Sequence, residues 1–134
     1  MEAWEQWREL ARESEKAARL AEAGDCPRPA ASRYYYAAYQ VVTALLLYRG
    51  LTPPETRDAW SHFETPLLLK EQLGPLIPSL DRRNDMARRL GELYKTRIDA
   101  DYIGINRMSA SRINRTRKDA GYLFKIVETI LPER

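Results

Sequence analysis

The sequence predicts an all-α protein, an up-and-down bundle of four to five helices that residues 1–134 form as a single domain. Every long segment repeats its apolar residues at three- and four-residue steps, which is the period of an amphipathic helix. No segment alternates apolar and polar residues over the length of a strand. The stretches between the periodic segments are short, as in bundles whose neighbouring helices run antiparallel. A chain of 134 residues is long enough to bury a core without disulfides or metals.

The first two helices are the most clearly periodic segments. The first is predicted from about Glu2 to Ala23, and Gly24-Asp25 ends it and supplies a possible cap for the second helix. The second is predicted from about Pro29 to Tyr48 and ends at Arg49-Gly50. Because it is apolar nearly all round, we expect it to be the central and most buried helix. The predicted inner side of the first helix carries Trp4, Trp7, Leu10, Ala11, Ala17, Ala18 and Ala21.

Prolines divide the middle of the chain. Pro53-Pro54 forces an extended connection, after which a third helix is predicted to begin near Glu55. Pro66 lies within this segment and is expected to kink or split the helix, because proline lacks an amide hydrogen and its ring clashes with the preceding turn. A loop that contains Gly74-Pro75 and Pro78 then precedes the fourth helix.

The last two helices complete the predicted bundle. The fourth is predicted from about Leu80 to Ile98 or Ala100, and residues 104–108 are predicted to form a loop. Ser109 or Ser111 should cap the last helix, because a serine hydroxyl accepts a hydrogen bond from an amide of the first turn. This helix is expected to reach Leu131. Its predicted inward-facing residues are Ile113, Ala120, Leu123, Phe124, Val127 and Ile130.

The composition is that of a soluble cytoplasmic protein without a cofactor. Apolar residues make up 44% of the chain and charged residues 31%, which is ordinary for a soluble helical protein. Cys26 is the single cysteine and His62 the single histidine, so neither a disulfide nor a metal site is expected. The longest apolar run, residues 41–47, is too short to span a bilayer. The acidic N-terminus does not look like a signal peptide.

The charge is unevenly distributed along the chain. Residues 2–25 hold seven acidic and four basic side chains, whereas residues 82–125 hold twelve basic and five acidic ones. A basic C-terminal half suits a polyanionic partner such as RNA, whose phosphates it would neutralise. Arginines on solvated helix faces would give the same count, so for any one arginine both interpretations stay open.

The segment around Arg97 is the most informative part of the sequence. On a helix, Met86, Leu90, Leu93 and Arg97 share one stripe, because they follow one another at three- and four-residue steps. A guanidinium at the end of an apolar stripe needs a partner for its charge and its five donors. Asp101, one turn further on, is the local candidate, and Tyr102 follows it. Two interpretations remain: an ion pair that fixes the helix end, or an arginine presented to a phosphate.

The chemistry available to such an arginine is phosphate cleavage without a metal. A positioned cation stabilises charge on a scissile phosphate, and a nearby phenol or imidazole can move a proton. RNA supplies its own nucleophile in the 2′-hydroxyl. A lone histidine is more often a structural or surface residue than a catalytic one, and we expect this of His62. The tyrosine cluster is expected to belong to the core, with its hydroxyls on polar partners, rather than to stack on bases; it consists of Tyr34, Tyr35, Tyr36 and Tyr39.

Three stretches carry a family resemblance. They are Ser32-Arg33-Tyr34-Tyr35-Tyr36-Ala37-Ala38-Tyr39, then Ala44-Leu45-Leu46 with Gly50-Leu51, then Leu93-Tyr94-Lys95-Thr96-Arg97-Ile98-Asp99-Ala100-Asp101-Tyr102. In this order and spacing they resemble the HEPN superfamily. The branch that the chain looks most like is the small stand-alone group with an Arg-x-x-Ala-Asp-Tyr signature. The similar region covers about residues 30 to 131.

The resemblance implies an all-α bundle that forms a homodimer, with the fourth-helix motifs of two copies meeting across a shared cleft. Members with an arginine followed by a histidine are metal-independent RNases. Many are toxins of toxin–antitoxin pairs whose antitoxin is a minimal nucleotidyltransferase, and others serve in CRISPR and other antiviral defence systems. Arg97 matches the family's arginine, but Asp101 and Tyr102 stand where the histidine would follow. In some members the antitoxin modifies a tyrosine near the arginine, and the resemblance makes Tyr102 the position in this chain that could be so modified.

Together these observations predict a toxin or defence-system component that binds or cleaves RNA as a homodimer. Arg97 would contact phosphate, with Arg33 lining the same cleft, Asp101 orienting the guanidinium, and Tyr102 as proton carrier or modification site. Two alternatives stay open. One is a non-catalytic module that binds a nucleotidyltransferase or another partner protein, and the other is a structural bundle within a larger complex.

Overall fold

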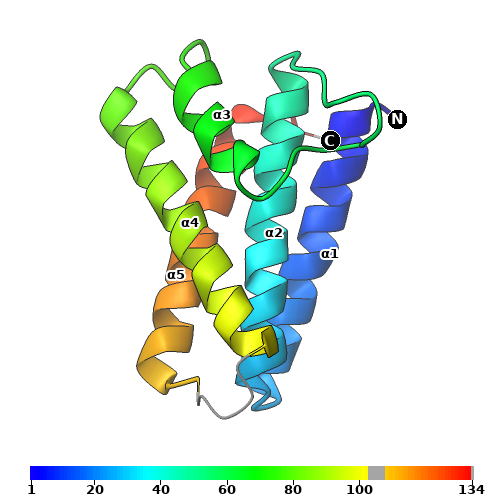
Figure 1. The fold of residues 1–134 in the computed structure, drawn as a ribbon. Coiled ribbons are helices and arrows are strands. Elements are labelled where there is room, and N and C mark those ends of the chain that lie inside the picture. Colours follow the sequence, from blue (N-terminus) through cyan, green and yellow to red (C-terminus); the bar gives the residue numbers. More distant parts are fainter. Residues whose placement is uncertain (103–107, 134) are drawn as a thin grey trace.

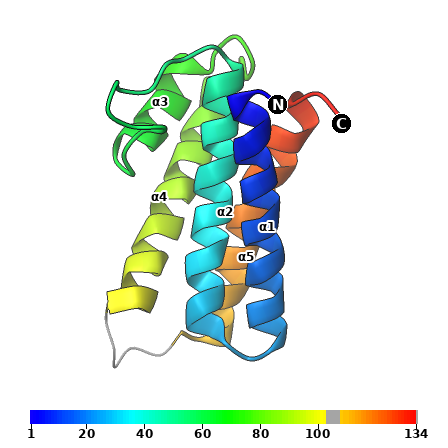
Figure 2. The same cartoon turned by 90° about the vertical axis from the view of Figure 1, so that its right-hand side faces the viewer.

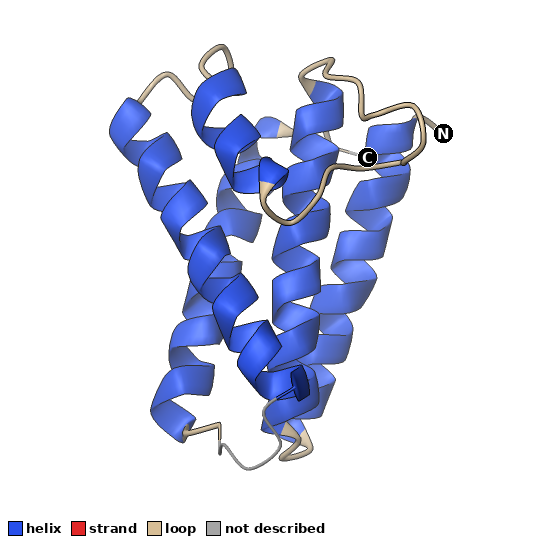
Figure 3. Ribbon diagram, viewed as in Figure 1, coloured by secondary structure: helices blue, strands red, loops and turns tan. Residues whose placement is uncertain are grey.

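The computed structural model describes residues 1–102 and 108–133, and in these ranges it contains five α-helices and no strand (Figures 1 and 3). Four long helices form the bundle, and a short one covers one end. The prediction of an all-α bundle is confirmed. The helices are α1 (Ala3–Ala23), α2 (Pro27–Tyr48), α3 (Glu64–Gln72), α4 (Leu80–Tyr102) and α5 (Ala110–Ile130).

Helix α2 is the centre of the bundle, as its apolar sequence predicts. It packs against each of the other four helices, and Figure 2 shows it between α4 and α1, with α5 behind. Its small and branched side chains let the neighbours approach closely and leave almost no side of the helix in water. Fully buried residues of α2 include Ala30, Tyr34, Tyr35, Ala38, Val41, Val42, Leu45 and Leu46.

Helix α1 buries a narrower stripe than the sequence predicts. Leu10 and Ala17 are exposed, whereas the polar residues Arg8 and Ser14 are buried. The reason is that α1 packs closely on α2 and meets α5 through the ion pairs Arg12–Glu128 and Glu22–Arg117, so one row of side chains is covered. The buried polar groups have partners: Arg8 Nη1 donates to the carbonyl of Pro132 at 2.5 Å, and the Ser14 hydroxyl accepts from the side-chain amide of Gln40 at 2.7 Å.

Helix α3 begins later than predicted. Residues 55–63 form turns and bends, and the helix starts at Glu64 rather than near Glu55. Ser61 and Glu64 form a reciprocal capping box, in which each side chain accepts a hydrogen bond at 3.1 Å from the other residue's amide. Pro66 causes no kink, because it is the third residue of the helix, where no intrahelical partner is needed for its missing amide hydrogen.

The ends of α4 and α5 agree with the predictions to within a few residues. Helix α4 continues to Tyr102, and Arg28 of α2 donates from Nε to the carbonyl of Ala100 at 2.9 Å, which satisfies a backbone acceptor near the helix end. Ser109 is the cap of α5, since its hydroxyl accepts from the Arg112 amide at 3.0 Å. Most of the loop predicted for residues 104–108 lies outside the described residues, and Met108 is non-helical.

The burial of α2 gives a stability prediction. Leu45→Ala removes a side chain with 0% exposure and should lower the free energy of unfolding by roughly 2–5 kcal/mol. Leu20→Ala makes the same change on α1 at a residue that is 64% exposed, and should change it by less than about 0.5 kcal/mol. Urea unfolding followed by circular dichroism measures both. Equal losses in the two variants would contradict the central position of α2.

Candidate functional site

Arg97 lies where its stripe on α4 leaves the core. Met86, Leu90 and Leu93 are buried, and the Arg97 side chain is 13% exposed. Its Nε lies 3.1 Å from Oδ2 of Asp101, so the predicted ion pair is confirmed. Nε is buried and makes no aligned hydrogen bond within the described residues, so this contact acts through charge rather than hydrogen-bond geometry. The guanidinium is therefore held at the helix end but not buried in the core.

Tyr36 of α2 is the second partner of Arg97. Nη2 of Arg97 donates to the Tyr36 hydroxyl at 2.8 Å, and the guanidinium carbon lies 5.3 Å from the centre of the ring. The guanidinium carbon of Arg33 lies 4.9 Å from the same ring. The negative face of one aromatic ring thus attracts two arginines that are far apart in the sequence. The remaining nitrogen, Nη1 of Arg97, makes no hydrogen bond or ion pair with a described residue. It is not one of the fully buried polar atoms that lack a hydrogen-bond partner, so it reaches the surface.

Asp101 and Tyr102 lie on the outer side of Arg97. Both are exposed, Tyr102 with 69% of its surface accessible, and the Tyr102 ring centre is 5.6 Å from the guanidinium carbon. A groove of about 640 Å³ opens beside Asp101 and is also lined by Arg33, Arg28 and Ser32. The structure thus brings the four predicted residues Arg33, Arg97, Asp101 and Tyr102 to one end of the α2–α4 face.

His62 belongs to the same cluster, which the sequence did not predict. It lies in the turn before α3, and its Nδ1 makes a hydrogen bond with the Tyr35 hydroxyl. Its ring stacks on Tyr94 of α4 at 5.1 Å and meets Tyr36 edge-on at 6.4 Å. Nε2 makes no hydrogen bond with any described residue and is not a buried orphan atom, so it also reaches the surface. Tyr36 therefore contacts both the cation and the imidazole.

The electrostatics of His62 follow from this position. Burial is the main cause of a lowered pKa, and the nearby positive charge of Arg97 lowers the pKa of His62 further. The imidazole is therefore largely neutral at pH 7, which suits a group that accepts a proton. Because the unfolded chain binds this proton more tightly, the free energy of unfolding falls as the pH drops below about 6.5 towards the lowered pKa.

The neighbouring tyrosines are core residues, as predicted. Tyr34 and Tyr35 are buried, and burial raises the pKa of both well above the usual range of a phenol, so their hydroxyls keep their protons. The hydroxyls have polar partners: Tyr34 donates to Glu22 at 2.7 Å, and Tyr39 donates to the carbonyl of Trp60. The hydrogen bond of Tyr39 fixes one of the rings against which His62 packs.

Within residues 1–102 and 108–133, no group of three or more histidine, cysteine or acidic side chains is arranged to hold a metal ion. None of the helices described is both long and apolar enough to cross a membrane.

Comparison with known proteins identifies the family. A family model described as HEPN domain matches residues 4–133, which is nearly the whole chain. The chain belongs to the HEPN family. A search of curated proteins found no similar sequence. The family predicted from the motifs of α2 and α4 is therefore confirmed, and the all-α bundle is the one expected of a HEPN domain.

This HEPN chain carries its polar groups on three different elements. Arg97, Asp101 and Tyr102 come from α4, Arg33 and Tyr36 from α2, and His62 from the connection between α2 and α3. Sequence spacing could not reveal His62, because 35 residues separate it from Arg97 and the intervening chain includes α3. The Ser-x-x-Glu pattern of residues 61–64 was the one local signal that a tight turn fixes this histidine.

The lowered pKa of His62 can be measured directly. The chain contains 1 histidine, so its imidazole proton resonances need no assignment. A proton NMR titration should give a midpoint below the ordinary value of about 6.5. Arg97→Met should raise the midpoint only in part, because burial is the larger cause of the shift. Arg88→Gln, which removes a charge from the solvent-exposed side of α4, should leave it unchanged. A native midpoint at or above about 6.5 would contradict the described packing.

Proposed function

We propose that this HEPN protein is a component of a toxin–antitoxin or defence system that binds RNA as a homodimer and cleaves it without a metal ion. One observation carries the proposal: Arg97 and His62 contact the same tyrosine, and each has one nitrogen at the surface without a partner among the described residues. A fixed cation beside a neutral imidazole is what cleavage of a phosphodiester by its own 2′-hydroxyl requires.

Phosphate binding is assigned to Arg97 and Arg33. Nη1 of Arg97 would donate to a non-bridging oxygen, while Asp101 and Tyr36 hold the other two nitrogens in place. The guanidinium loses little freedom on binding because it is already oriented. Arg33 contacts the Tyr36 ring and borders the groove beside Asp101, where it could contact the next phosphate. The basic excess of residues 82–125 would add a general attraction for RNA.

Proton transfer is assigned to His62 and Tyr102. The 2′-oxygen attacks phosphorus and its proton moves to Nε2 of His62. This step requires the His62 tautomer in which Nδ1 donates the hydrogen bond that it shares with the Tyr35 oxygen. The bond between phosphorus and the 5′-oxygen breaks, and that oxygen takes a proton from the Tyr102 phenol. Nε2 of His62 then releases its proton to solvent and the Tyr102 phenolate takes one from solvent, so both groups return to their starting states. The products are a 2′,3′-cyclic phosphate and a 5′-hydroxyl end. Because Tyr102 is 69% exposed, an antitoxin of the nucleotidyltransferase type could also modify it and block the site.

The homodimer is proposed from the apolar surface next to the site. Phe63 is 79% exposed and Leu67, four residues later on the same side of α3, is 51% exposed. Phe63 packs edge-on against Tyr94 at 5.9 Å, and Tyr94 in turn stacks on His62. Exposed aromatic and aliphatic residues around a polar site are typical of protein interfaces. A second copy on this surface would enclose the two sites in one cleft, as expected of the family.

A second candidate function is a non-catalytic module that binds a partner protein. The observation in its favour is that Asp101 and Tyr36 already occupy two nitrogens of Arg97, so the arginine also has a structural role. The two functions differ in one measurable property, which is cleavage of RNA in the absence of divalent metal.

Cleavage gives the decisive prediction. Purified protein incubated with a fluorescent RNA oligonucleotide in EDTA should release fragments that end in a 2′,3′-cyclic phosphate. Arg97→Ala should slow this by roughly 10²–10³-fold, the usual cost of losing one donor to the developing negative charge. Lys95→Ala removes a cation that is 74% exposed on the same helix and should have little effect. Intact RNA with the native protein would exclude cleavage, and RNA binding that is indifferent to Arg97→Ala would exclude the binding role as well.

The pH dependence of the same assay tests whether His62 is the group that accepts the proton of the 2′-hydroxyl. If His62 accepts the proton, the rate should fall as the pH drops through its lowered pKa, because the protonated imidazole can no longer act as a base. His62→Gln should remove this limb of the pH profile and slow cleavage by roughly 10²–10⁴-fold. A limb that persists in His62→Gln would assign the proton to a different group.

The dimer has its own test. Phe63→Glu places a charge on the proposed interface and should convert the dimer into a monomer in light scattering. Leu20→Glu makes an equal change on α1, at a residue that is 64% exposed, and should leave the dimer intact. A native protein that is monomeric at the concentrations used for cleavage would rule out a shared cleft.

A further inference from the structure

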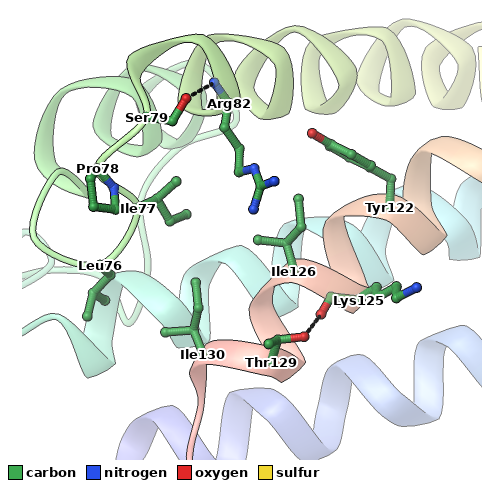
Figure 4. Close-up of a pocket in the computed structure, with 10 residues that line it drawn as sticks. All are labelled: Leu76, Ile77, Pro78, Ser79, Arg82, Tyr122, Lys125, Ile126, Thr129 and Ile130. Carbon is green, nitrogen blue, oxygen red and sulfur yellow. Dashed lines mark hydrogen bonds between the residues drawn. The ribbon is translucent and has the colours of Figure 1, made fainter.

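A second hollow lies at the opposite end of the bundle from Arg97. It is a groove of about 560 Å³ between the C-terminal half of α5 and the connection from α3 to α4 (Figure 4). None of the residues that line it belongs to the cluster around Arg97 and His62. The proposed contacts with the scissile phosphate and the proposed proton transfers therefore give this groove no role.

The floor of the groove is an apolar face of α5 that other helices cover only in part, since Arg89 of α4 lies over the ring of Tyr122. Tyr122, Ile126 and Ile130 follow one another at four-residue steps, so they form one stripe of partly buried side chains. Among the helices described, α5 packs closely on α2 and α4, and ion pairs of Glu128 with Arg12 and of Arg117 with Glu22 link it to α1. The N-terminal end of α4 leans away from the C-terminal end of α5, and α3 does not reach across (Figures 1 and 2). Leu76 and Ile77 close the apolar floor from the other side.

The rim of the groove is positively charged. Arg82 points from the first turn of α4 across the groove towards α5, and Lys125 lies on the α5 side (Figure 4). Both are exposed, and neither forms an ion pair with a described residue. Asp81 precedes Arg82 but is exposed and forms no ion pair with a described residue, and the next acidic residues are paired elsewhere: Asp85 with Arg88 and Arg89, and Glu128 with Arg12. The groove thus combines an apolar floor with two cations whose charge is not neutralised by ion pairs.

We propose that this groove docks an acidic amphipathic helix of a partner protein. Apolar side chains of that helix would cover Ile126, Ile130 and Leu76, and its carboxylates would meet Arg82 and Lys125. The α5 stripe from Tyr122 to Ile130 is about 12 Å long at 1.5 Å per residue, which matches two turns of a helix laid beside it. An RNA backbone fits less well, because phosphates would be placed against an apolar floor and lose hydration without gaining hydrogen bonds.

The test uses a designed probe and charge reversal. The probe is a fluorescein-labelled synthetic helix of about 15 residues, with leucines on one face and glutamates along both edges. Fluorescence anisotropy should show that it binds the native protein, and Arg82→Glu with Lys125→Glu should weaken binding by roughly tenfold or more. The matched control, Lys16→Glu with Lys95→Glu, changes the net charge equally at exposed residues away from the groove and should bind as the native protein does. Thermal unfolding of each variant verifies that it is folded.

Nuclear magnetic resonance locates the contact. In the native protein the probe should shift the amide resonances of Ile126, Ile130 and Leu76, and leave those of Arg97 and Tyr36 in place. A probe that does not bind below roughly 1 mM would overturn the proposal. Equal weakening of probe binding in the groove variant and in the Lys16→Glu with Lys95→Glu control would also overturn it, because the probe would then be attracted by the overall charge of the protein. Two other outcomes would also overturn it. If Arg82→Glu with Lys125→Glu abolished oligouridylate binding but not probe binding, the groove would be assigned to RNA. If it abolished self-association instead, the groove would be assigned to a second copy of the chain.

Discussion

The arrangement of this site depends on one constraint, which is that the charge of Arg97 must be stabilised by neighbouring groups where the apolar stripe of α4 ends. A guanidinium at the edge of a core is costly unless anions, hydrogen-bond acceptors or aromatic faces surround it. Asp101 supplies the charge from the next turn, and Tyr36 supplies a hydroxyl and a ring from α2. The ion pair by itself would fix only the end of α4. The contact with Tyr36 ties that end to the central helix and so gives the arginine one position in the bundle.

Tyr36 also explains how a histidine enters the site without the spacing that the family's RNases use. Helix α2 presents Tyr35, Tyr36 and Tyr39 towards the connection that precedes α3, and His62 packs among them. The capping box of Ser61 and Glu64 holds that turn in place. A cation and an imidazole that are independent in sequence thus share an aromatic support, and the charge of one lowers the pKa of the other.

The tilt of α4 connects the two ends of the molecule. Where α4 meets α2, Arg97 and its partners are brought together, and where α4 leans away from α5, an apolar stripe is left open beside Arg82 and Lys125. One end therefore offers oriented polar groups that suit a phosphate. The other offers an apolar floor with a basic rim that suits a protein segment. The two proposals are therefore compatible, because a partner protein docked at one end would not compete with an RNA bound at the other.

The sequence alone determined what depends on neighbours along one helix. The period of apolar residues predicted the four long helices and the central place of α2, and the four-residue step from Arg97 to Asp101 predicted their ion pair. The sequence predicted the start of α3 wrongly, because the local hydrogen bonds of Ser61 outweighed the general helical pattern of apolar residues after Glu55. Tertiary structure decided the rest. The contacts of His62 and Arg33 with Tyr36, like the open face of α5, depend on how the helices cross. The crossing is set by the packing of side chains from different helices, and the spacing of residues within one helix does not encode it.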